Sequence, residues 1–191
     1  MISSRHRSTT RHTGTAIGLL GVALALVGCA SDGEDGSAAT VTDAVHDGPL
    51  PVTAIDYAYT GVVDRVRAGT TLTLDNASAT EVHEIVAIRL PDDETRPVDE
   101  LVALAPDELA AFFPLVETVL VAPPGEAGFP VEGTGVLAEP GRYALLCVIP
   151  TGAVPDDYLA AAAAADGEPP QVDGGPPHIA SGMFAEVLVV E

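Results

Sequence analysis

Short runs rich in Val, Ile, Thr, Leu and Tyr recur from residue 51 to the C-terminus, and Gly, Pro, Asn and Asp separate them. The β-branched and aromatic residues favour strands, whereas the separating residues favour turns. Several runs also alternate between apolar and polar residues, as half-buried strands do. This pattern is typical of an all-β sandwich or barrel. We predict strands over 51–59, 62–67, 70–75, 83–90, 141–148 and 184–190.

Two segments depart from the β pattern and indicate insertions. Residues 97–113 (PVDELVALAPDELAAFF) have helical spacing, with helix starts at Asp99 and Pro106, inside an interruption that spans 91–134. Residues 156–165 (DDYLAAAAAA) begin with two acidic residues and continue into an alanine run of high helix propensity. They lie inside a second interruption over 148–177. We therefore expect one β-sandwich with two partly helical insertions.

The N-terminus has the three parts of a secretory signal: a basic stretch with Arg5, Arg7 and Arg11, an apolar run over 16–27, and small residues before a cysteine. The apolar run is too short for an ordinary membrane span, which needs about 20 residues. Residues 26–29 (LVGC) resemble the lipobox of bacterial lipoproteins, in which the peptidase cuts before Cys and the thiol carries a diacylglycerol. The resemblance implies a signal peptide over 1–28 and an extracytoplasmic domain anchored to the membrane by lipid on Cys29. A plain secretory signal with an incidental cysteine is the alternative.

The region after the expected cut divides into a tether and a domain. Residues 29–50 are small, acidic and without apolar periodicity, so we expect a flexible tether, and 51–191 are long enough for one domain with a core. All 28 acidic residues follow residue 28, against five arginines and no lysine. Such a chain repels nucleic acid, so nucleic-acid binding is excluded. We expect a monomer, and the charge by itself identifies no partner.

Cys147 would be left unpaired if Cys29 is lipidated, because the chain has only two cysteines. A lone thiol in an exported protein suggests a specific role. His178 and Met183 stand five positions apart directly before the last predicted strand, and His83 opens an earlier one. Only three histidines follow residue 28, and two of them belong to this group.

A thiolate, two imidazoles and a weak thioether are donors that suit a copper ion cycling between Cu(I) and Cu(II). Sulfur favours Cu(I), imidazole suits both oxidation states, and a long axial Met bond helps to set the reduction potential. We therefore consider His83, Cys147, His178 and Met183 as candidate copper ligands. Electron transfer at such a site needs no substrate pocket, only an exposed edge of one ligand.

Three motifs together resemble the cupredoxins, the blue (type 1) copper family of plastocyanin and pseudoazurin. Residues 140–147 (PGRYALLC) are similar to the family's P-G-x-Y strand leading to the copper thiolate. Residues 178–190 (HIASGMFAEVLVV) are similar to its H-x4-M segment and final strand, and residues 76–86 (NASATEVHEIV) to its N…H-x-I-V segment. The resemblance covers about 52–191 but fails over the two insertions.

The resemblance implies a cupredoxin-like Greek-key β-sandwich with type 1 copper held by His83, Cys147, His178 and Met183. It also implies single-electron transfer with an unknown redox partner, and no enzymatic activity. One departure is large, because 30 residues (148–177) separate the Cys from the second His, which in the family lie about two residues apart. By the logarithmic rule such a loop costs only about 2 kcal/mol more to close. Residues 150–152 and 174–177 flank it, so a helical excursion could leave and return near one point.

Each candidate ligand also has a purely structural interpretation. Cys147 could be a small buried hydrophobe, Met183 core packing, and His83 a strand-end residue bonded to backbone. His178, in a proline-rich loop, has the weakest such interpretation. If these structural interpretations all hold, the protein is a cupredoxin-like sandwich that no longer binds copper. The competing functions are a copper-handling protein, or a metal-free adhesion or ligand-binding lipoprotein; in either, the helix over 156–165 would cover the site.

Enzymatic alternatives have less support. The chain contains no phosphate-binding loop and no G-x-S-x-G motif. A Cys147 nucleophile with a histidine base is conceivable, but such a thiol outside the cell would be easily oxidised. Three histidines cannot supply the additional copper cluster of a copper oxidase. Glu84 beside His83 is interpreted as a solvated strand-edge carboxylate.

Overall fold

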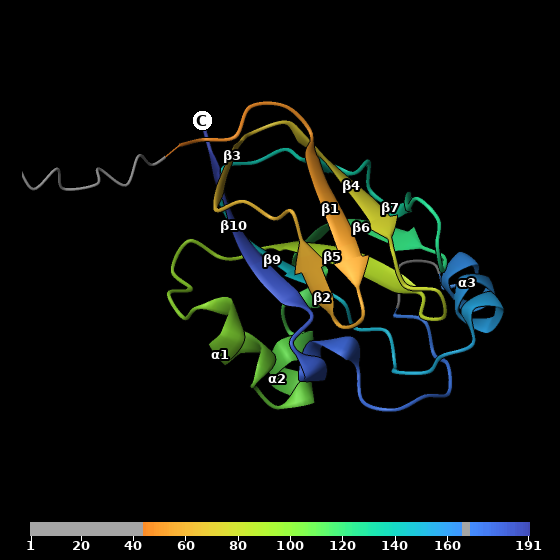
Figure 1. Ribbon diagram of the computed structural model, residues 1–191. Coiled ribbons are helices and arrows are strands. Elements are labelled where there is room, and N and C mark those ends of the chain that lie inside the picture. The colour runs from red at the N-terminus through yellow and green to blue at the C-terminus, as the bar shows by residue number, and fades with distance from the viewer. Residues whose placement is uncertain (1–43, 166–168) are drawn as a thin grey trace, which may run out of the picture. The chain divides into compact units, whose positions relative to one another are not determined.

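The computed structural model describes residues 44–165 and 169–191, which form two packed β-sheets with short helices at one end and one side (Figure 1). The smaller sheet has the order β2 (Ala58–Thr60), β1 (Leu50–Ile55), β4 (Thr70–Asn76) and β8 (Val136–Leu137). The larger sheet has the order β3 (Arg65–Arg67), β10 (Phe184–Val190), β9 (Gly141–Leu146), β5 (His83–Arg89), β6 (Val116–Ala122) and β7 (Phe129–Glu132). The all-β sandwich expected from the sequence is confirmed.

The helical elements are short. They are α1 (Val98–Val102), α2 (Pro106–Ala110), α3 (Pro155–Ala163) and the 3-10 turns η1 (Phe113–Leu115) and η2 (His178–Ser181). Among the described residues, no helix has the length and apolarity needed to cross a membrane. The predicted signal peptide over 1–28, the lipidation site Cys29 and most of the tether lie outside the described residues.

The main core lies between the two sheets, and strand alternation decides which side chains enter it. In β4 every second residue is buried, as expected for a strand with one face toward the core. β5 is buried along almost its whole length, because Ile85 and Ala87 face the inter-sheet core while Val86 and Ile88 face a second cluster with α1 and α2. β9 behaves in the same way, with Tyr143 and Leu145 on the inner face.

Two boundaries predicted from the sequence are wrong. The run over 51–59 is not one strand but a hairpin, in which β1 and β2 pair antiparallel around a turn at Asp56 and Tyr57. Neither turn residue is Gly or Pro, so the sequence does not indicate the turn. Tyr57 itself adopts a positive φ of 61°. The interruption over 91–134 also contains β6 and β7, which extend the larger sheet beyond β5. Only about its first half, with α1, α2 and η1, is inserted between strands.

Candidate metal centre

His83 and Cys147 reach the same point because they lie on neighbouring strands of the larger sheet. His83 is the first residue of β5, and Cys147 follows the last residue of β9, which pairs antiparallel with β5. Side chains alternate along a strand, so His83 shares the inner face with Ile85, and Cys147 shares it with Leu145. Both candidate ligands therefore lie at one end of the inter-sheet core.

The long insertion after Cys147 begins and ends at two adjacent segments, 150–152 and 174–177, which together are called the neck. Pro150 and Pro177 form an isolated antiparallel bridge, and the Thr151 and Gly175 amides donate to Pro176 O and Thr151 O at 3.0 and 2.8 Å. A Cβ on Gly174 would lie 2.5 Å from Pro150 Cβ, so only glycine permits this close approach. The expectation that the chain leaves and returns near one point is confirmed.

The neck brings the second histidine back to the cysteine. The His178 amide donates to Ile149 O at 3.0 Å, and the Ile179 amide donates to Cys147 O at 2.9 Å. η2 ends at Ser181, and Gly182, with a left-handed φ of 100°, then turns the chain toward β10. Met183 follows directly, and its carbonyl accepts the Cys147 amide at 3.2 Å.

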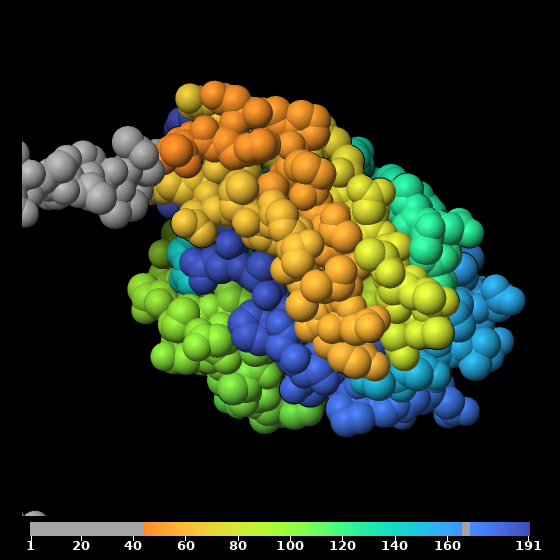
Figure 2. All heavy atoms as spheres, viewed as in Figure 1, coloured from red at the N-terminus to blue at the C-terminus, as the bar shows by residue number. Residues whose placement is uncertain are grey.

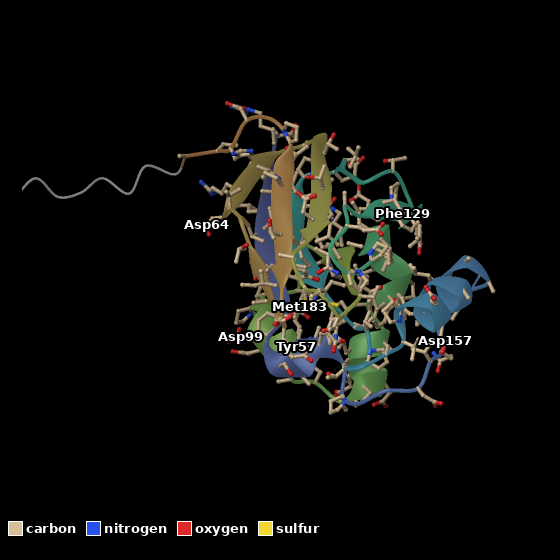
Figure 3. The ribbon with its side chains drawn as sticks, turned by 45° about the vertical axis from the view of Figure 1, so that its right-hand side comes forward. Tyr57, Asp64, Asp99, Phe129, Asp157 and Met183 are labelled. Atoms are coloured by element: carbon tan, nitrogen blue, oxygen red, sulfur yellow. The ribbon has the colours of Figure 1, made fainter. Side chains whose placement is uncertain are left out.

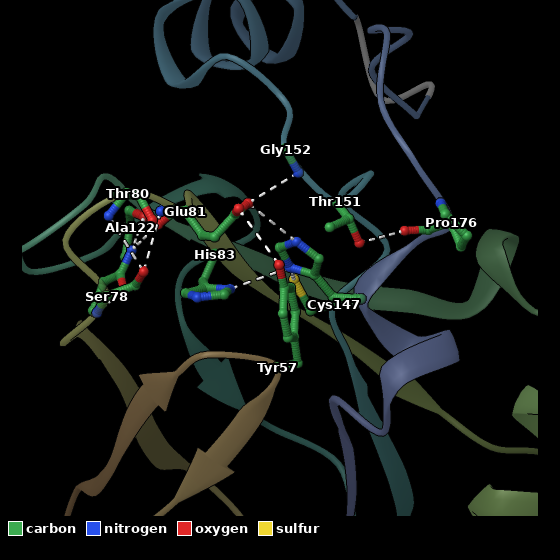
Figure 4. A network of polar contacts seen from close by, with 12 residues as sticks. Tyr57, Ser78, Thr80, Glu81, His83, Ala122, Cys147, Thr151, Gly152 and Pro176 are labelled. Atoms are coloured by element: carbon green, nitrogen blue, oxygen red, sulfur yellow. Dashed lines mark hydrogen bonds and ion pairs between the residues drawn. The ribbon is translucent and has the colours of Figure 1, made fainter.

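Three of the four candidate ligands present their donor atoms to one another. Nδ1 of His178 lies 3.2 Å from Sγ of Cys147 and 3.2 Å from Nδ1 of His83 (Figure 4). All three donor atoms lie within 4.8 Å of one another. A trigonal ion with bonds of about 2 Å separates its donors by about 3.5 Å, so the two 3.2 Å spacings around Nδ1 of His178 are close to those of a coordination shell.

Met183 lies in the same part of the core. Its side chain is fully buried in the cluster that contains Cys147. Figure 3 shows Met183 and Tyr57 at the same end of the sandwich. Two imidazoles, a thiolate and a weak thioether are the donor set of a type 1 copper site, and the residues present fit that ion.

Burial controls the protonation of the three polar donors. Burial, followed by the neighbouring His178, lowers the pKa of His83 to about 4. Burial also lowers the pKa of His178, and it raises the pKa of the Cys147 thiol well above its ordinary value, with Glu84 adding to the effect. Both imidazoles are therefore neutral at pH 7 and ready to bind a cation, whereas the thiol must release a proton when a metal binds.

None of the four candidate ligands has an exposed edge. His83, Cys147, His178 and Met183 are all 0% exposed. The β1–β2 turn covers His178, because the Tyr57 ring packs edge-on against the His178 ring with centroids 4.9 Å apart. Figure 2 shows the β1–β2 hairpin, in orange, lying against the blue C-terminal segment on this face.

Glu84 was misinterpreted from the sequence. It is 2% exposed rather than solvated, because Tyr158 of α3 and the chain at Val148 contact its carboxylate on the face of β5 opposite to His83. Its carboxylate accepts the Val148 amide at 3.0 Å and the Tyr158 hydroxyl at 2.6 Å. Burial raises the pKa of Glu84 to about 7, against the lowering effect of these two hydrogen bonds. Glu84 thus joins the ends of both ligand strands to α3.

Glu81 and Tyr57 are further residues that the sequence did not single out. The Glu81 carboxylate lies 3.5 Å from Nε2 of His178 and accepts the Gly152 amide at 3.2 Å. The Tyr57 hydroxyl approaches the other Glu81 oxygen at 3.5 Å. A carboxylate two positions before His83 was the only sequence signal for Glu81, and nothing in the pattern marked Tyr57.

The candidate ligands have a fixed order along the chain and the strands. His83 begins β5, Cys147 follows β9, and His178 and Met183 precede β10. The described residues thus form a two-sheet β-sandwich, as the motifs predict, with a buried group of two histidines and one cysteine. No protein-family model matches the chain, and no curated protein matches it in sequence.

Among solved structures the chain is similar to auracyanins. A dithionite-reduced auracyanin from the photosynthetic bacterium Roseiflexus castenholzii is 21% identical, over 78% of this chain and 100% of that one, with a TM-score of 0.42. Auracyanin B is 18% identical over 76% and 90% of the two chains, with a TM-score of 0.41. Auracyanin A, a "blue" copper protein from Chloroflexus aurantiacus, is 16% identical over 74% and 98%, with a TM-score of 0.39.

Proposed function

We propose that this domain binds one copper ion as a type 1 site and transfers single electrons. The observation that carries the proposal is the convergence of the donor atoms of His83, Cys147 and His178 in a fully buried position. Met183, buried in the same apolar cluster as Cys147, would supply a weak thioether ligand. A site held by two sheets and the neck changes little when the ion gains or loses an electron, which favours fast transfer.

The protein's own residues supply the conditions for this chemistry. Burial excludes water from the donors and keeps both imidazoles neutral. The copper supplies the one-electron couple. The amide hydrogen bonds from Cys147, His178 and Ile179 fix the two ligand segments against each other, so that the donors are positioned before an ion arrives.

Titration of the purified domain with Cu(II) tests the proposal. We expect an intense absorption near 600 nm that saturates at one ion per chain and bleaches on reduction. Cys147→Ser should abolish the band, because the thiolate-to-copper transition is lost. His46→Ala is the matched control, since His46 is a histidine outside the donor group that contacts Pro49 O; it should keep the band. A wild-type protein that stays colourless with Cu(II) contradicts the proposal.

A copper-handling role is the second candidate, and the full burial of all four donors favours it. A copper-handling protein would retain Cu(I) tightly, and its copper would not cycle between Cu(I) and Cu(II). Reversible bleaching and recovery of the 600 nm band through repeated reduction and oxidation supports electron transfer, whereas retention of Cu(I) against an oxidant supports handling.

We further propose that lipid on Cys29 anchors the domain outside the cytoplasm and that residues 29–50 let it reach a redox partner. The support is the LVGC sequence after a basic and apolar N-terminus. Expression in a bacterium fed labelled palmitate should label the wild-type chain and not Cys29→Ala. Equal labelling of both chains would contradict the anchor.

A further inference from the structure

The ring of His178 has one nitrogen in the donor group and one outside it. Nδ1 faces Cys147 Sγ and His83 Nδ1, both at 3.2 Å. Nε2 is completely buried and has no hydrogen-bond partner within ordinary geometry. The charged group that Nε2 faces is the Glu81 carboxylate, at 3.5 Å. A histidine that binds a metal through Nδ1 carries its proton on Nε2, so that proton is directed toward Glu81.

Glu81 is held in place by three separate segments of the chain. Its backbone is fixed by Asn76 and Ser78, since the Asn76 amide group donates to Glu81 O at 2.8 Å and the Glu81 amide donates to Ser78 Oγ at 3.1 Å. Its carboxylate is fixed by the Gly152 amide at the neck and by the Tyr57 hydroxyl in the β1–β2 turn. Figure 4 shows Gly152 and Tyr57 approaching the Glu81 carboxylate from different segments of the chain.

Tyr57 reaches this position through an unusual backbone conformation. Among the described residues it is the only non-glycine with positive φ, at 61°. A bulky side chain in that region costs about 1–3 kcal/mol, so surrounding contacts must stabilise it. The contacts present are the edge-on packing against His178 and the approach of the hydroxyl to Glu81. The turn and the carboxylate therefore form one unit over His178.

We propose that Glu81 is a positioning residue that fixes the proton of His178 on Nε2 and, through that imidazole, lowers the reduction potential of the copper site. The first half of this proposal concerns the His178 proton, and the second half concerns the reduction potential. The second half rests on the proposed function. Carboxylates that face the outer nitrogen of a ligating histidine orient the ring and increase its basicity. A negative charge near the site also favours the ion in its higher charge state, which is Cu(II). Reduction adds one electron to the ion, and no bond to Glu81 or Tyr57 forms or breaks.

The metal-free protein tests the first half. Nitrogen-15 NMR of the His178 ring should show the proton on Nε2 in the wild type and in Glu81→Gln, because the amide oxygen still accepts it. Glu81→Leu removes the acceptor and should give a mixture of tautomers. A wild-type ring protonated on Nδ1, or an unchanged tautomer in Glu81→Leu, overturns this half without reference to copper.

The copper-loaded protein tests the second half. We expect Glu81→Gln to change the Cu(II)-to-Cu(I) affinity ratio by about tenfold in favour of Cu(I), equivalent to a potential about 59 mV higher for a one-electron couple. Glu81→Asp keeps the charge and should stay nearer to the wild-type potential than Glu81→Gln does. Because Glu81→Asp also shortens the side chain, it separates loss of charge from loss of packing.

Asp56→Asn is the matched control. Asp56 is an exposed neighbour of Tyr57 whose charge acts on His83 over a distance, and the substitution removes the same charge without altering the contact to Nε2. Its potential should move clearly less than that of Glu81→Gln. Equal shifts in the two variants, or none in Glu81→Gln, overturn the proposal. A wild-type protein without the 600 nm band instead contradicts the proposed function and leaves the NMR result to decide the role of Glu81.

Discussion

The two helical insertions of this domain differ in what they do for the sandwich. The first, with α1 and α2, packs Val98, Leu101 and Leu109 against the outer faces of β5 and β9 and builds a second apolar cluster there. The second, with α3, sends Tyr158 to the buried carboxylate of Glu84, whose other oxygen accepts the amide that follows Cys147. Figure 1 shows α3 on the other side of the molecule from α1 and α2. Similar interruptions of a β pattern thus stabilise a sheet in one place and support a site in the other.

The difference has a physical origin in where each insertion is attached. The first connects β5 to β6, which are adjacent strands, and joins them at the end away from His83. The second lies between the proposed ligands Cys147 and His178, so its closure determines how those two residues meet. Changes in the second insertion should therefore affect both stability and copper, and changes in the first should affect stability alone.

The largest effect is expected for Tyr158→Ala. Removing a buried aromatic ring costs about 3–5 kcal/mol, and the Glu84 oxygen that it leaves without a donor adds to this. Urea unfolding of the metal-free protein should show the loss of stability. The 600 nm band of any folded copper-loaded protein should shift or weaken, because Glu84 also holds the amide next to Cys147. An unchanged band would show that α3 does not support the site.

Leu101→Ala is the matched change in the first insertion. Leu101 is 2% exposed, and its truncation should lower the free energy of unfolding by about 2–5 kcal/mol. The position and intensity of the copper band should remain those of the wild type. A perturbed band would contradict the separation of the two insertions.

Glu84→Gln should reveal a pH dependence specific to the second insertion. The folded protein raises the pKa of Glu84 to about 7, so this group contributes stability at low pH and loses it as the pH rises through 7. Relative to Glu84→Gln, the metal-free wild type should lose about 2 kcal/mol of unfolding free energy between pH 5 and pH 7. Urea unfolding at both pH values checks this. Parallel changes in the two proteins would mean that Glu84 is not the titrating group.

The smallest effect is expected for Tyr158→Phe, which keeps the ring and removes only the hydroxyl. The loss of one hydrogen bond to Glu84 should cost about 1 kcal/mol of unfolding free energy. The copper band should change less than in Tyr158→Ala. If Tyr158→Phe proves as destabilising as Tyr158→Ala, the hydroxyl and not the packing of α3 dominates.

Much of this site could be predicted from the sequence because three of its four candidate ligands, His83, Cys147 and Met183, lie at or next to strand ends. β5 and β9 are marked by their composition, and alternation along a strand places His83 and Cys147 on a definite face. The turn signals around 150–152 and 174–177 also indicated that the excursion closes on itself, as the Pro150 to Pro177 bridge confirms. β6 was missed even though Pro114 separates the helical segment over 97–113 from its first residue, Val116.

The amino-acid sequence by itself determined the all-β architecture, the helical segments, and the four side chains that could hold a copper ion. These follow from local preferences and from donor chemistry, which depend on residue type and spacing. Only the tertiary structure decided that the donors are buried, that Glu84 is a buried acid, and that Tyr57 and Glu81 cover His178. Burial depends on what the opposing segments place over a residue, and α3 and the β1–β2 turn lie far from their neighbours at the site along the chain.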